Sequence, residues 1–224
     1  MIELKHVTKV FPPETVVLRE ANLHIPRGDY VLIGGTVGSG TSVLFQLLLR
    51  YELATRGEVN VFGRDLAKLT HKEIPLLRRR IGWISQEPQF MQTRSVYENL
   101  SDILYASGTV GREADQRTRE VLSQLGLEFA ADSLPGELSR GQAQKLAIAR
   151  SLLLHPAILL ADDPFAYLTV DEVHSMVEMF KDLNVRRGLT ILVATYTLPS
   201  ETLGVKRVVE IQNGAIIEHP VADV

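Results

Sequence analysis

The stretch Gly35-Thr36-Val37-Gly38-Ser39-Gly40-Thr41-Ser42 decides the fold of this chain. It follows the apolar run at residues 30–33, which predicts a buried strand, and it precedes residues 43–49, which predict a helix. A glycine-rich turn between a strand and a helix directs several backbone N–H groups at one point, beside the positive end of the helix dipole. The sequence therefore predicts a loop that cradles phosphate, and a tight turn that holds no phosphate is the alternative.

The spacing of this loop matches the phosphate-binding pattern G-x-x-x-x-G-K-[ST] at every position but one. Thr41 stands where the pattern has lysine, whereas Ser42 keeps the hydroxyl that binds Mg²⁺ in such loops. The predicted cradle is present and its cation is missing, which leaves open whether it still holds a nucleotide. The candidate nucleotide-binding residues of the loop and the first helical turn are Gly35, Thr36, Val37, Gly38, Ser39, Gly40, Thr41, Ser42 and Val43.

The composition is that of an ordinary globular protein and excludes several classes of function. With 224 residues, 45% of them hydrophobic and 23% charged, the chain can bury a sizeable core in one large or two small domains. A net charge of −3 gives no electrostatic case for nucleic acid as a partner, and the absence of cysteine excludes disulfides and thiolate chemistry. The first residues lack the apolar core of a signal peptide, and no apolar run approaches the ~20 residues of a membrane span. We therefore expect a cytosolic protein, or one held at a membrane by a partner.

Hydrophobic periodicity predicts a sheet that a helical insertion interrupts. Alternation at residues 2–11 and 16–25 predicts antiparallel strands with one buried face. Residues 157–161 are apolar throughout, as in a parallel strand covered on both faces, whereas the pattern from 86 to 154 is helical. The basic run 78–80 is interpreted as a solvated face. The remaining expected elements are strands at 57–63, 81–84 and 190–194, helices at 72–80, 140–154 and 170–183, and a terminal hairpin at 208–218 built on Asn213-Gly214.

Two further segments carry chemistry that suits the cradle. Asp162 lies at the C-terminal edge of the apolar strand, where an aspartate in phosphate-loop enzymes helps to hold Mg²⁺. The alternative is an aspartate that begins the turn before Pro164. The segment Leu138-Ser139-Arg140-Gly141-Gln142 opens the helix predicted at 140–154.

The order of these motifs, over nearly the whole chain, resembles the ATP-binding subunits of ABC transporters. The matching features are the cradle, an isolated glutamine at Gln86, the Leu-Ser-x-Gly-Gln signature segment, the strand ending in Asp162 and the terminal hairpin. Residues 77–82, 94–100 and 159–162 are most similar to the FtsE-type branch of bacterial cell division, and the lipoprotein-release branch is similar too. The resemblance implies an α/β P-loop NTPase fold of the ABC type with an antiparallel β subdomain and a helical insertion. It also implies a single domain over residues 1–224, with 1–85 and 155–224 as the core and 86–154 as the helical subdomain.

The resemblance further implies cofactors and partners. ATP and Mg²⁺ are expected between the cradle of one subunit and the signature segment of a second, in a homodimer or in a heterodimer with another ABC ATPase subunit. An integral membrane subunit, FtsX-like or a permease, is expected to hold the chain in the cytoplasm at the inner face of the cell membrane. Its expected docking place follows Gln86, where Phe90, Met91, Val96 and Tyr97 are candidates for an apolar groove. For Val96 we favour a place in the core of the subdomain itself.

Carried over residue by residue, the resemblance assigns roles within this chain. It implies that Ser42, Gln86 and Asp162 bind Mg²⁺ and that Asp163, Tyr196 and Gln86 are catalytic. It also implies that Phe11 stacks on adenine, and that the signature acting in trans consists of Ser139, Arg140, Gly141 and Gln142. Departures from the family are Thr41 for lysine, Asp163 for glutamate, Tyr196 for histidine, Thr169 for aspartate, Arg140 for glycine and, mildly, Phe11 for tyrosine. Because five of these lie at catalytic contacts, we expect impaired or absent hydrolysis and a regulatory or structural role.

Three other interpretations stay open. The chain is a slow ATPase that uses Asp163 to drive a conformational change in a membrane partner, or it is the inactive half of an asymmetric dimer, or it is a binding module unrelated to nucleotides. A hypothesis of compensation concerns Arg140, whose guanidinium would face the γ-phosphate on the second subunit and replace the cation lost at Thr41. The alternative for Arg140 is a solvent-facing arginine at the start of a helix.

Overall fold

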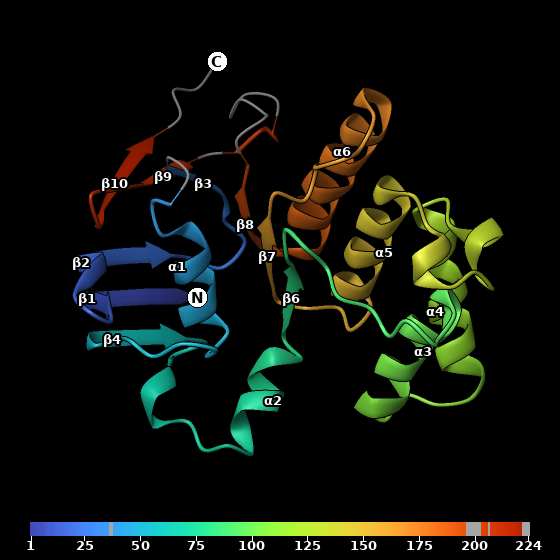
Figure 1. The fold of residues 1–224 in the computed structure, drawn as a ribbon, viewed down its shortest axis with the longest axis horizontal. Helices are drawn as coiled ribbons and strands as arrows, with labels where there is room; N and C mark the ends of the chain where they lie inside the picture. Colours follow the sequence, from blue (N-terminus) through green and yellow to red (C-terminus); the bar gives the residue numbers. More distant parts are fainter. Residues whose placement is uncertain (36–37, 196–202, 206, 221–224) are drawn as a thin grey trace.

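The computed structural model describes residues 1–35, 38–195, 203–205 and 207–220, which form two sheets and a group of helices (Figure 1). The strands are β1 Ile2–Phe11, β2 Thr15–Ile25, β3 Tyr30–Gly35, β4 Arg56–Val61, β5 Arg64–Asp65, β6 Ile81–Ile84, β7 Ile158–Asp162, β8 Thr190–Ala194, β9 Arg207–Gln212 and β10 Ala215–Pro220. The α-helices are α1 Thr41–Leu48, α2 Glu73–Arg78, α3 Val96–Ser107, α4 Arg112–Gln124, α5 Arg140–Leu152 and α6 Val170–Arg187.

The smaller sheet is antiparallel, with strand order β2-β1-β4-β5. Strands β1 and β2 pair from Ile2↔Ile25 at one end to Phe11↔Thr15 at the hairpin turn. Ile2 and Leu4 of β1 are buried because alternate side chains of a strand point to the same face, and after a register shift between Leu4 and Val7 the buried positions continue at Val7 and Lys9. The antiparallel strands predicted from alternation are therefore confirmed.

The larger sheet has six strands in the order β10-β9-β3-β8-β7-β6; every neighbouring pair from β9 to β6 is parallel, and β10 pairs antiparallel with β9. Both faces of β7 are buried: Leu159 and Ala161 belong to one hydrophobic cluster, and Ile158 and Leu160 belong to the other. This explains why the sequence of β7 is apolar throughout. The terminal hairpin predicted at Asn213 is confirmed, since β9 and β10 pair as antiparallel neighbours.

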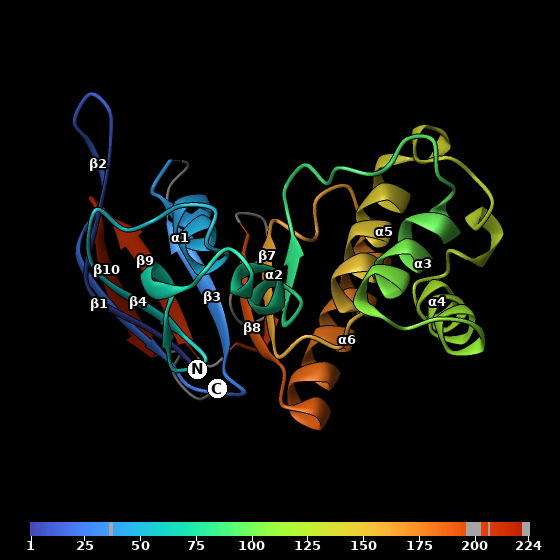
Figure 2. The same cartoon turned by 90° about the horizontal axis from the view of Figure 1, so that it is seen from below.

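The helices cover the larger sheet from two sides (Figures 1 and 2). Helix α1 lies between the two sheets and packs in one cluster with the smaller sheet, whereas α5 and α6 pack against the opposite face of the larger sheet. Helices α3 and α4 extend beyond α5 at the end of the molecule away from the smaller sheet. The helical segment therefore shares a continuous core with the sheet, in which Val96, Leu100 and Leu146 join Phe180 of α6.

Sequence patterns located the elements well and their ends less well. Helix α5 ends at Leu152 rather than at residue 154, and α6 continues to Arg187, about one turn beyond the predicted end. The interpretation of residues 78–80 as a solvated face is wrong for Arg78, whose guanidinium donates to the carbonyl oxygens of Leu49 and Arg50 at 2.9 and 3.0 Å. Arg78 thereby binds carbonyl groups at the C-terminal end of α1, which lack partners within the helix.

Within the described part of the chain, no helix combines the length and the apolar character that a membrane span requires.

Candidate nucleotide-binding site

The cradle begins at the end of β3 and delivers the chain into α1 through Gly40. Gly40 is the N-cap residue of α1 and has a φ of 109°, a left-handed value that favours glycine. A Cβ at this position would lie 2.6 Å from Cγ1 of Val17, so β2 of the smaller sheet packs directly on the cradle. The predicted residues Thr36 and Val37 lie outside the described part of the chain, and Gly35, Gly38 and Ser39 occupy the strand end and the turn as expected.

Thr41, at the position of the missing lysine, is directed into the protein. Thr41 is only 3% exposed, and its Oγ1 lies 3.2 Å from Oγ of Ser39. The hydroxyl pair is neutral, so it can donate hydrogen bonds but cannot neutralise phosphate charge. The predicted cradle therefore has a buried hydroxyl at the position where the phosphate-loop pattern has lysine.

Ser42 and Asp162, which are 120 positions apart in the sequence, meet beside the cradle. The Ser42 hydroxyl donates to Oδ2 of Asp162 at 2.8 Å. Asp162 ends β7 and is 6% exposed, and burial raises the pKa of its carboxyl above the ordinary value. The hydrogen bond from Ser42 opposes this rise, and the charge of the neighbouring Asp163 adds to it. One hydroxyl and one carboxylate are oxygen ligands of the kind that Mg²⁺ prefers, so these two residues fit the metal that the sequence predicts.

Asp163, the candidate for polarising water, is fixed by its surroundings. Its backbone has a φ of 48°, its N–H donates to the carbonyl of Ala194 at 2.8 Å, and the Thr195 hydroxyl donates to its Oδ1 at 3.1 Å. Among the described residues, no lysine or arginine forms an ion pair with Asp162 or Asp163. In the part of the chain that the structure describes, the two adjacent carboxylates at this edge of the sheet therefore lie without a basic side chain in contact with them.

Of the other two predicted catalytic residues, Gln86 is not joined to the site and Tyr196 is not among the described residues. Gln86 lies two positions beyond β6 with an exposed side chain, and no described residue links it by a hydrogen bond to Ser42 or Asp162. Its role in metal binding and catalysis stays a prediction. Tyr196 lies outside the described residues, directly after Thr195.

Phe11, the predicted stacking residue, ends β1 at the hairpin that borders the cradle. Its side chain is half-buried, and Val17, which touches Gly40, lies on the paired strand close to it. The cradle and the hairpin that carries Phe11 are thus connected through β2, and the stacking role of Phe11 stays a prediction.

The signature segment forms the N-terminus of α5. Ser139 is the N-cap residue: its Oγ accepts from the N–H of Gln142 at 3.2 Å, and its own N–H donates to Oε1 of Gln142 at 2.7 Å. This reciprocal pair is a capping box. Gly141 is needed for a close approach, because a Cβ there would lie 3.0 Å from the carbonyl oxygen of Tyr167.

Arg140 is exposed, and its guanidinium carbon lies 5.1 Å from the ring centroid of Tyr167. Both side chains line a hollow of about 570 Å³ beside the N-terminus of α5. Thr169, predicted to stand in place of an aspartate, is the N-cap residue of α6: its hydroxyl accepts from the N–H of Glu172 at 3.4 Å, and its N–H and hydroxyl donate to Oε2 of Glu172 at 2.9 and 3.0 Å. Lys145 pairs with Glu172 at 2.6 Å on the same wall and is the main cause that lowers the pKa of Glu172 to about 2.

Helix α5 carries two side chains that sequence patterns did not single out. Gln144 is buried, and its Nε2 donates to the carbonyl of Pro164 at 3.0 Å, which ties the signature helix to the residue after Asp163. Near the other end of α5, the Arg150 guanidinium donates to the carbonyl of Gln89 and lies 5.0 Å from the Phe90 ring centroid. A polar residue on the buried face of a helix is the signal that would have pointed to Gln144.

The four candidates for an apolar docking groove separate in the structure. Val96 is fully buried in the core, as favoured from the sequence, and the Tyr97 hydroxyl donates to Oδ1 of Asp115 at 2.8 Å. Phe90 is half-buried beneath Arg150, whereas Met91 is 45% exposed. Val96 is therefore excluded from a contact with a partner, whereas Phe90, Met91 and Tyr97 stay candidates.

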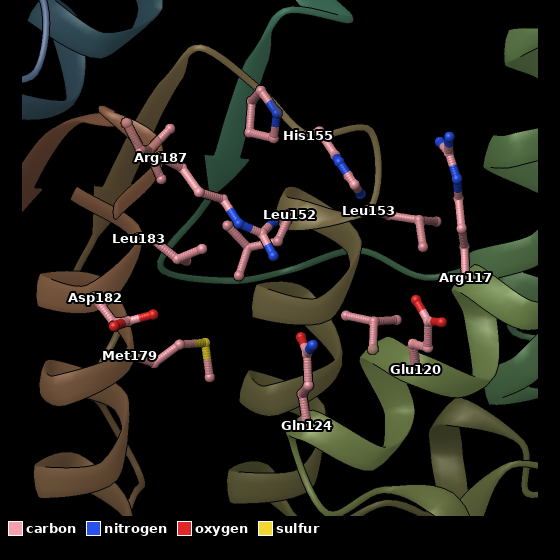
Figure 3. Close-up of a pocket in the computed structure, with 13 residues that line it drawn as sticks. Arg117, Glu120, Gln124, Leu152, Leu153, His155, Met179, Asp182, Leu183 and Arg187 are labelled. Carbon is pink, nitrogen blue, oxygen red and sulfur yellow. The ribbon is translucent and has the colours of Figure 1, made fainter. Parts of the chain in front are cut away.

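A second hollow lies between α4, the C-terminal end of α5 and α6 (Figure 3). It measures about 380 Å³ and contains the guanidinium groups of Arg117 and Arg187 and the carboxylates of Glu120 and Asp182, whose charges balance. Burial, and then Arg117 and Arg187, lower the pKa of His155. This hollow lies at the ends of α5 and α6 opposite to Ser139 and Thr169, and none of the predicted site residues lines it.

Comparisons with known proteins agree with this geometry. Residues 18–166 match the family model described as ABC transporter. The chain is 32% identical over 217 residues to the cell division ATP-binding protein FtsE of Streptococcus pneumoniae, covering 97% of this chain and 94% of that protein. It is 37% identical over 225 residues to the methionine import ATP-binding protein MetN of Escherichia coli K12, covering 97% of this chain but only 64% of MetN.

Among solved structures, the chain is similar to the ATP-binding cassette MJ0796 in a dimeric post-hydrolysis state bound to ADP and Pi. The TM-score is 0.92 at 29% identity, and all of both chains is covered. A dimeric structure of MJ0796 described as a bacterial ABC transporter cassette matches with the same TM-score at 30% identity. The fold, the order of motifs and these matches together show that the chain belongs to the ABC transporter family of ATP-binding proteins.

Proposed function

We propose that this chain is an FtsE-type ATP-binding subunit of a membrane complex that binds Mg²⁺–ATP weakly and hydrolyses it slowly or not at all. The observation that carries the proposal is a contrast within one site. Ser42 and Asp162 are joined at 2.8 Å, which supports a shared metal ion, whereas the adjacent Thr41 is buried, uncharged and paired with Ser39. Two of the three predicted metal ligands thus lie together, and the residue beside them carries no positive charge.

The expected loss of affinity follows from the missing charge. A hydrogen bond to a charged group contributes ~1.5–3 kcal/mol, so replacing lysine by threonine lowers affinity about tenfold to hundredfold. The neutral hydroxyls of Thr41 and Ser39 already lie 3.2 Å apart, which supports weak binding by the remaining backbone groups rather than a restored site.

Slow hydrolysis is supported by the position of Asp163. An aspartate reaches about 1.5 Å less far than a glutamate, and errors of ~1 Å in the placement of a reacting group cost about a hundredfold in rate. Its Oδ1 also accepts a hydrogen bond from Thr195, which holds the carboxylate toward the end of β8. These effects act on one step and are not additive.

Calorimetry with ATP and Mg²⁺, combined with an assay of phosphate release, tests the proposal on the full chain. We expect weak binding by the wild type without steady phosphate release. Thr41→Lys should tighten ATP binding about tenfold to hundredfold. Thr41→Met, which introduces a side chain of about the length of lysine without its charge, should not tighten it. Steady turnover by the wild type, or equal affinity of the Lys and Met variants, would contradict the proposal.

The signature of a second subunit is proposed to supply part of the missing charge through Arg140. Its guanidinium is exposed in the hollow beside Ser139 and has only the Tyr167 ring as a partner among the described residues, so it is available to a phosphate group. Arg140→Gly should then weaken both ATP affinity and ATP-dependent dimerisation, and Arg140→Lys should retain most of both. If Arg140→Gly changes neither, the charge is not supplied in trans.

A second candidate function is the inactive half of an asymmetric dimer. The capping box of Ser139 and Gln142 and the close fit of Gly141 support it, because the signature is built although the cradle has lost its cation. In a mixed dimer with a competent ATP-binding subunit, Ser139→Ala in this chain should lower phosphate release, whereas Thr41→Lys should leave it unchanged. The opposite result favours a homodimer with two weak sites.

The membrane partner is proposed to be an FtsX-like or permease subunit that holds the chain at the cytoplasmic face of the cell membrane. Exposed Met91 and half-buried Phe90 support docking beside Arg150. Cross-linking from position 91 in membranes should capture an integral membrane protein, and equal capture from position 185 on α6 would count against this surface.

A further inference from the structure

Lys9 places a positive charge at a buried position of β1 in the smaller sheet. The residue is 8% exposed, although lysine is almost never buried without a partner. Its Nζ contacts Oε2 of Glu52 at 2.7 Å and donates to the carbonyl of Leu53 at 2.9 Å. The third contact is aromatic: Nζ lies 4.4 Å from the centroid of the Phe11 ring. The ammonium is thus held by a carboxylate, a carbonyl and a ring face.

The contact with Lys9 occupies one face of the Phe11 ring. Lys9 and Phe11 are two positions apart on β1, so both side chains point to the same side of the strand. Because the ammonium covers one face, a planar group can stack only on the opposite face of this half-buried ring. The attraction between cation and ring also restricts rotation of the ring before any ligand arrives.

The same lysine connects the ring with the cradle helix. Glu52 and Leu53 follow the end of α1, the helix that begins at the cradle, and Lys9 binds both of them. A neighbouring bond, from the N–H of Val10 to the Thr55 hydroxyl at 3.0 Å, fastens the same part of β1. Lys9 therefore links the Phe11 ring to the segment that follows α1, the helix that begins at the phosphate loop.

We propose that Lys9 is a positioning residue that presents the outer face of Phe11 to the base of a bound nucleoside triphosphate. The inference rests on the proposed nucleotide binding and adds to it the residue that fixes base stacking. Lys9 touches neither phosphate nor base, so its removal should weaken only the part of the binding that depends on the base. A purely structural lysine would weaken binding of base and phosphate alike.

The test compares ATP with inorganic tripolyphosphate, each with Mg²⁺, by calorimetry on the full chain. In the wild type, ATP should bind more tightly than tripolyphosphate, because stacking adds to the phosphate contacts. Lys9→Met should reduce that affinity ratio about threefold to tenfold, while the affinity for tripolyphosphate stays within about twofold. Lys9→Arg should restore the ratio. Lys5→Met, which removes an exposed lysine of the same strand, is the matched control and should leave the ratio unchanged.

The outcomes separate this inference from the proposed function. Failure of the wild type to bind ATP overturns both. An unchanged ratio in Lys9→Met, when the wild type binds ATP, overturns the role of Lys9 alone, and so does an equal loss for both ligands.

A measurement on the wild type needs no variant and covers the case in which Lys9→Met does not fold. The ε-methylene protons of Lys9 should show an upfield ring-current shift in NMR spectra. That shift should persist when ATP is added, because the base takes the other face of Phe11. Loss of the shift on adding ATP would overturn the inference.

Discussion

Replacing Ser42 with alanine removes the hydroxyl that donates to Asp162 at 2.8 Å. The bond involves a charged acceptor, for which contributions of ~1.5–3 kcal/mol are usual. Asp162 is 6% exposed and can recruit little water, but Ser42 itself is exposed, so water can enter where the hydroxyl was. We therefore expect Ser42→Ala to lower the free energy of unfolding by about 1–2 kcal/mol at neutral pH, in the absence of nucleotide and Mg²⁺.

The partner variant Asp162→Asn should behave differently. Burial and the charge of Asp163 both disfavour the ionised Asp162, so a neutral amide that still accepts from Ser42 should leave stability unchanged or raise it by up to about 1 kcal/mol. In this background, Ser42→Ala should cost only about 0.5 kcal/mol. The double-mutant cycle, measured by urea unfolding, should give a coupling energy of about 1 kcal/mol.

The sign of the pH dependence provides a second check. The pKa of Asp162 is raised in the folded chain, which means that the folded state favours the protonated carboxyl. The stability that this preference contributes is therefore present at acid pH and is lost as the pH rises through the raised pKa. The bond from Ser42 opposes the rise, and its removal shifts this loss to higher pH. Ser42→Ala should therefore cost more at about pH 7.5 than near pH 4. Equal costs of Ser42→Ala in the wild-type and Asp162→Asn backgrounds, or a larger cost near pH 4, would refute the reasoning.

Three further perturbations address the fold around the site. Glu172→Gln removes a carboxylate whose pKa Lys145 helps to lower to about 2. The stability that this pair contributes is present above the pKa of the unfolded chain and is lost as the pH falls toward 2. The variant should therefore lose ~1 kcal/mol of unfolding free energy at pH 7, and its stability, measured by urea unfolding, should fall less steeply toward acid pH. Gln144→Leu leaves the Pro164 carbonyl without its donor and should lower the free energy of unfolding by ~1–3 kcal/mol, measured by urea unfolding. A variant as stable as the wild type would contradict a stabilising role of this hydrogen bond. Val96→Ala empties a fully buried position and should lower Tm with a loss of ~1–3 kcal/mol, unlike a surface position.

The parts of the fold that follow from periodicity were predictable from the sequence. The alternation of β1 and the unbroken apolar run of β7 each reflect burial on one or two faces, and the glycines of the cradle reflect a turn between a strand and a helix. Asp162 was predictable for the same reason, because the C-terminal ends of parallel strands meet at one edge of a sheet, where Ser42 also lies. These signals are local, and each depends on a few neighbouring residues.

Contacts between distant segments were not predictable in this way. Nothing in the neighbourhood of Thr195 indicates that its hydroxyl donates to Asp163, and nothing near Lys9 indicates that it binds Glu52 after α1. Such pairs depend on how the two sheets and the helices pack, which periodicity does not encode. The predicted approach of Gln86 to the metal pair has the same character, because it depends on the path of an exposed segment beyond β6.

Helix α5 connects two surfaces of the protein. Arg150 holds the Gln89–Phe90 segment near one end, and Ser139 begins the helix at the other. Eleven residues at ~1.5 Å each separate them by about 16 Å, so a tilt of about 5° about Arg150 displaces the Ser139 hydroxyl by roughly 1.4 Å. A displacement of that size is enough to make or break hydrogen bonds to a phosphate group. A tilt of a few degrees, imposed at the exposed Gln89–Phe90 segment, would therefore displace the Ser139 end of α5 without changing the helix itself.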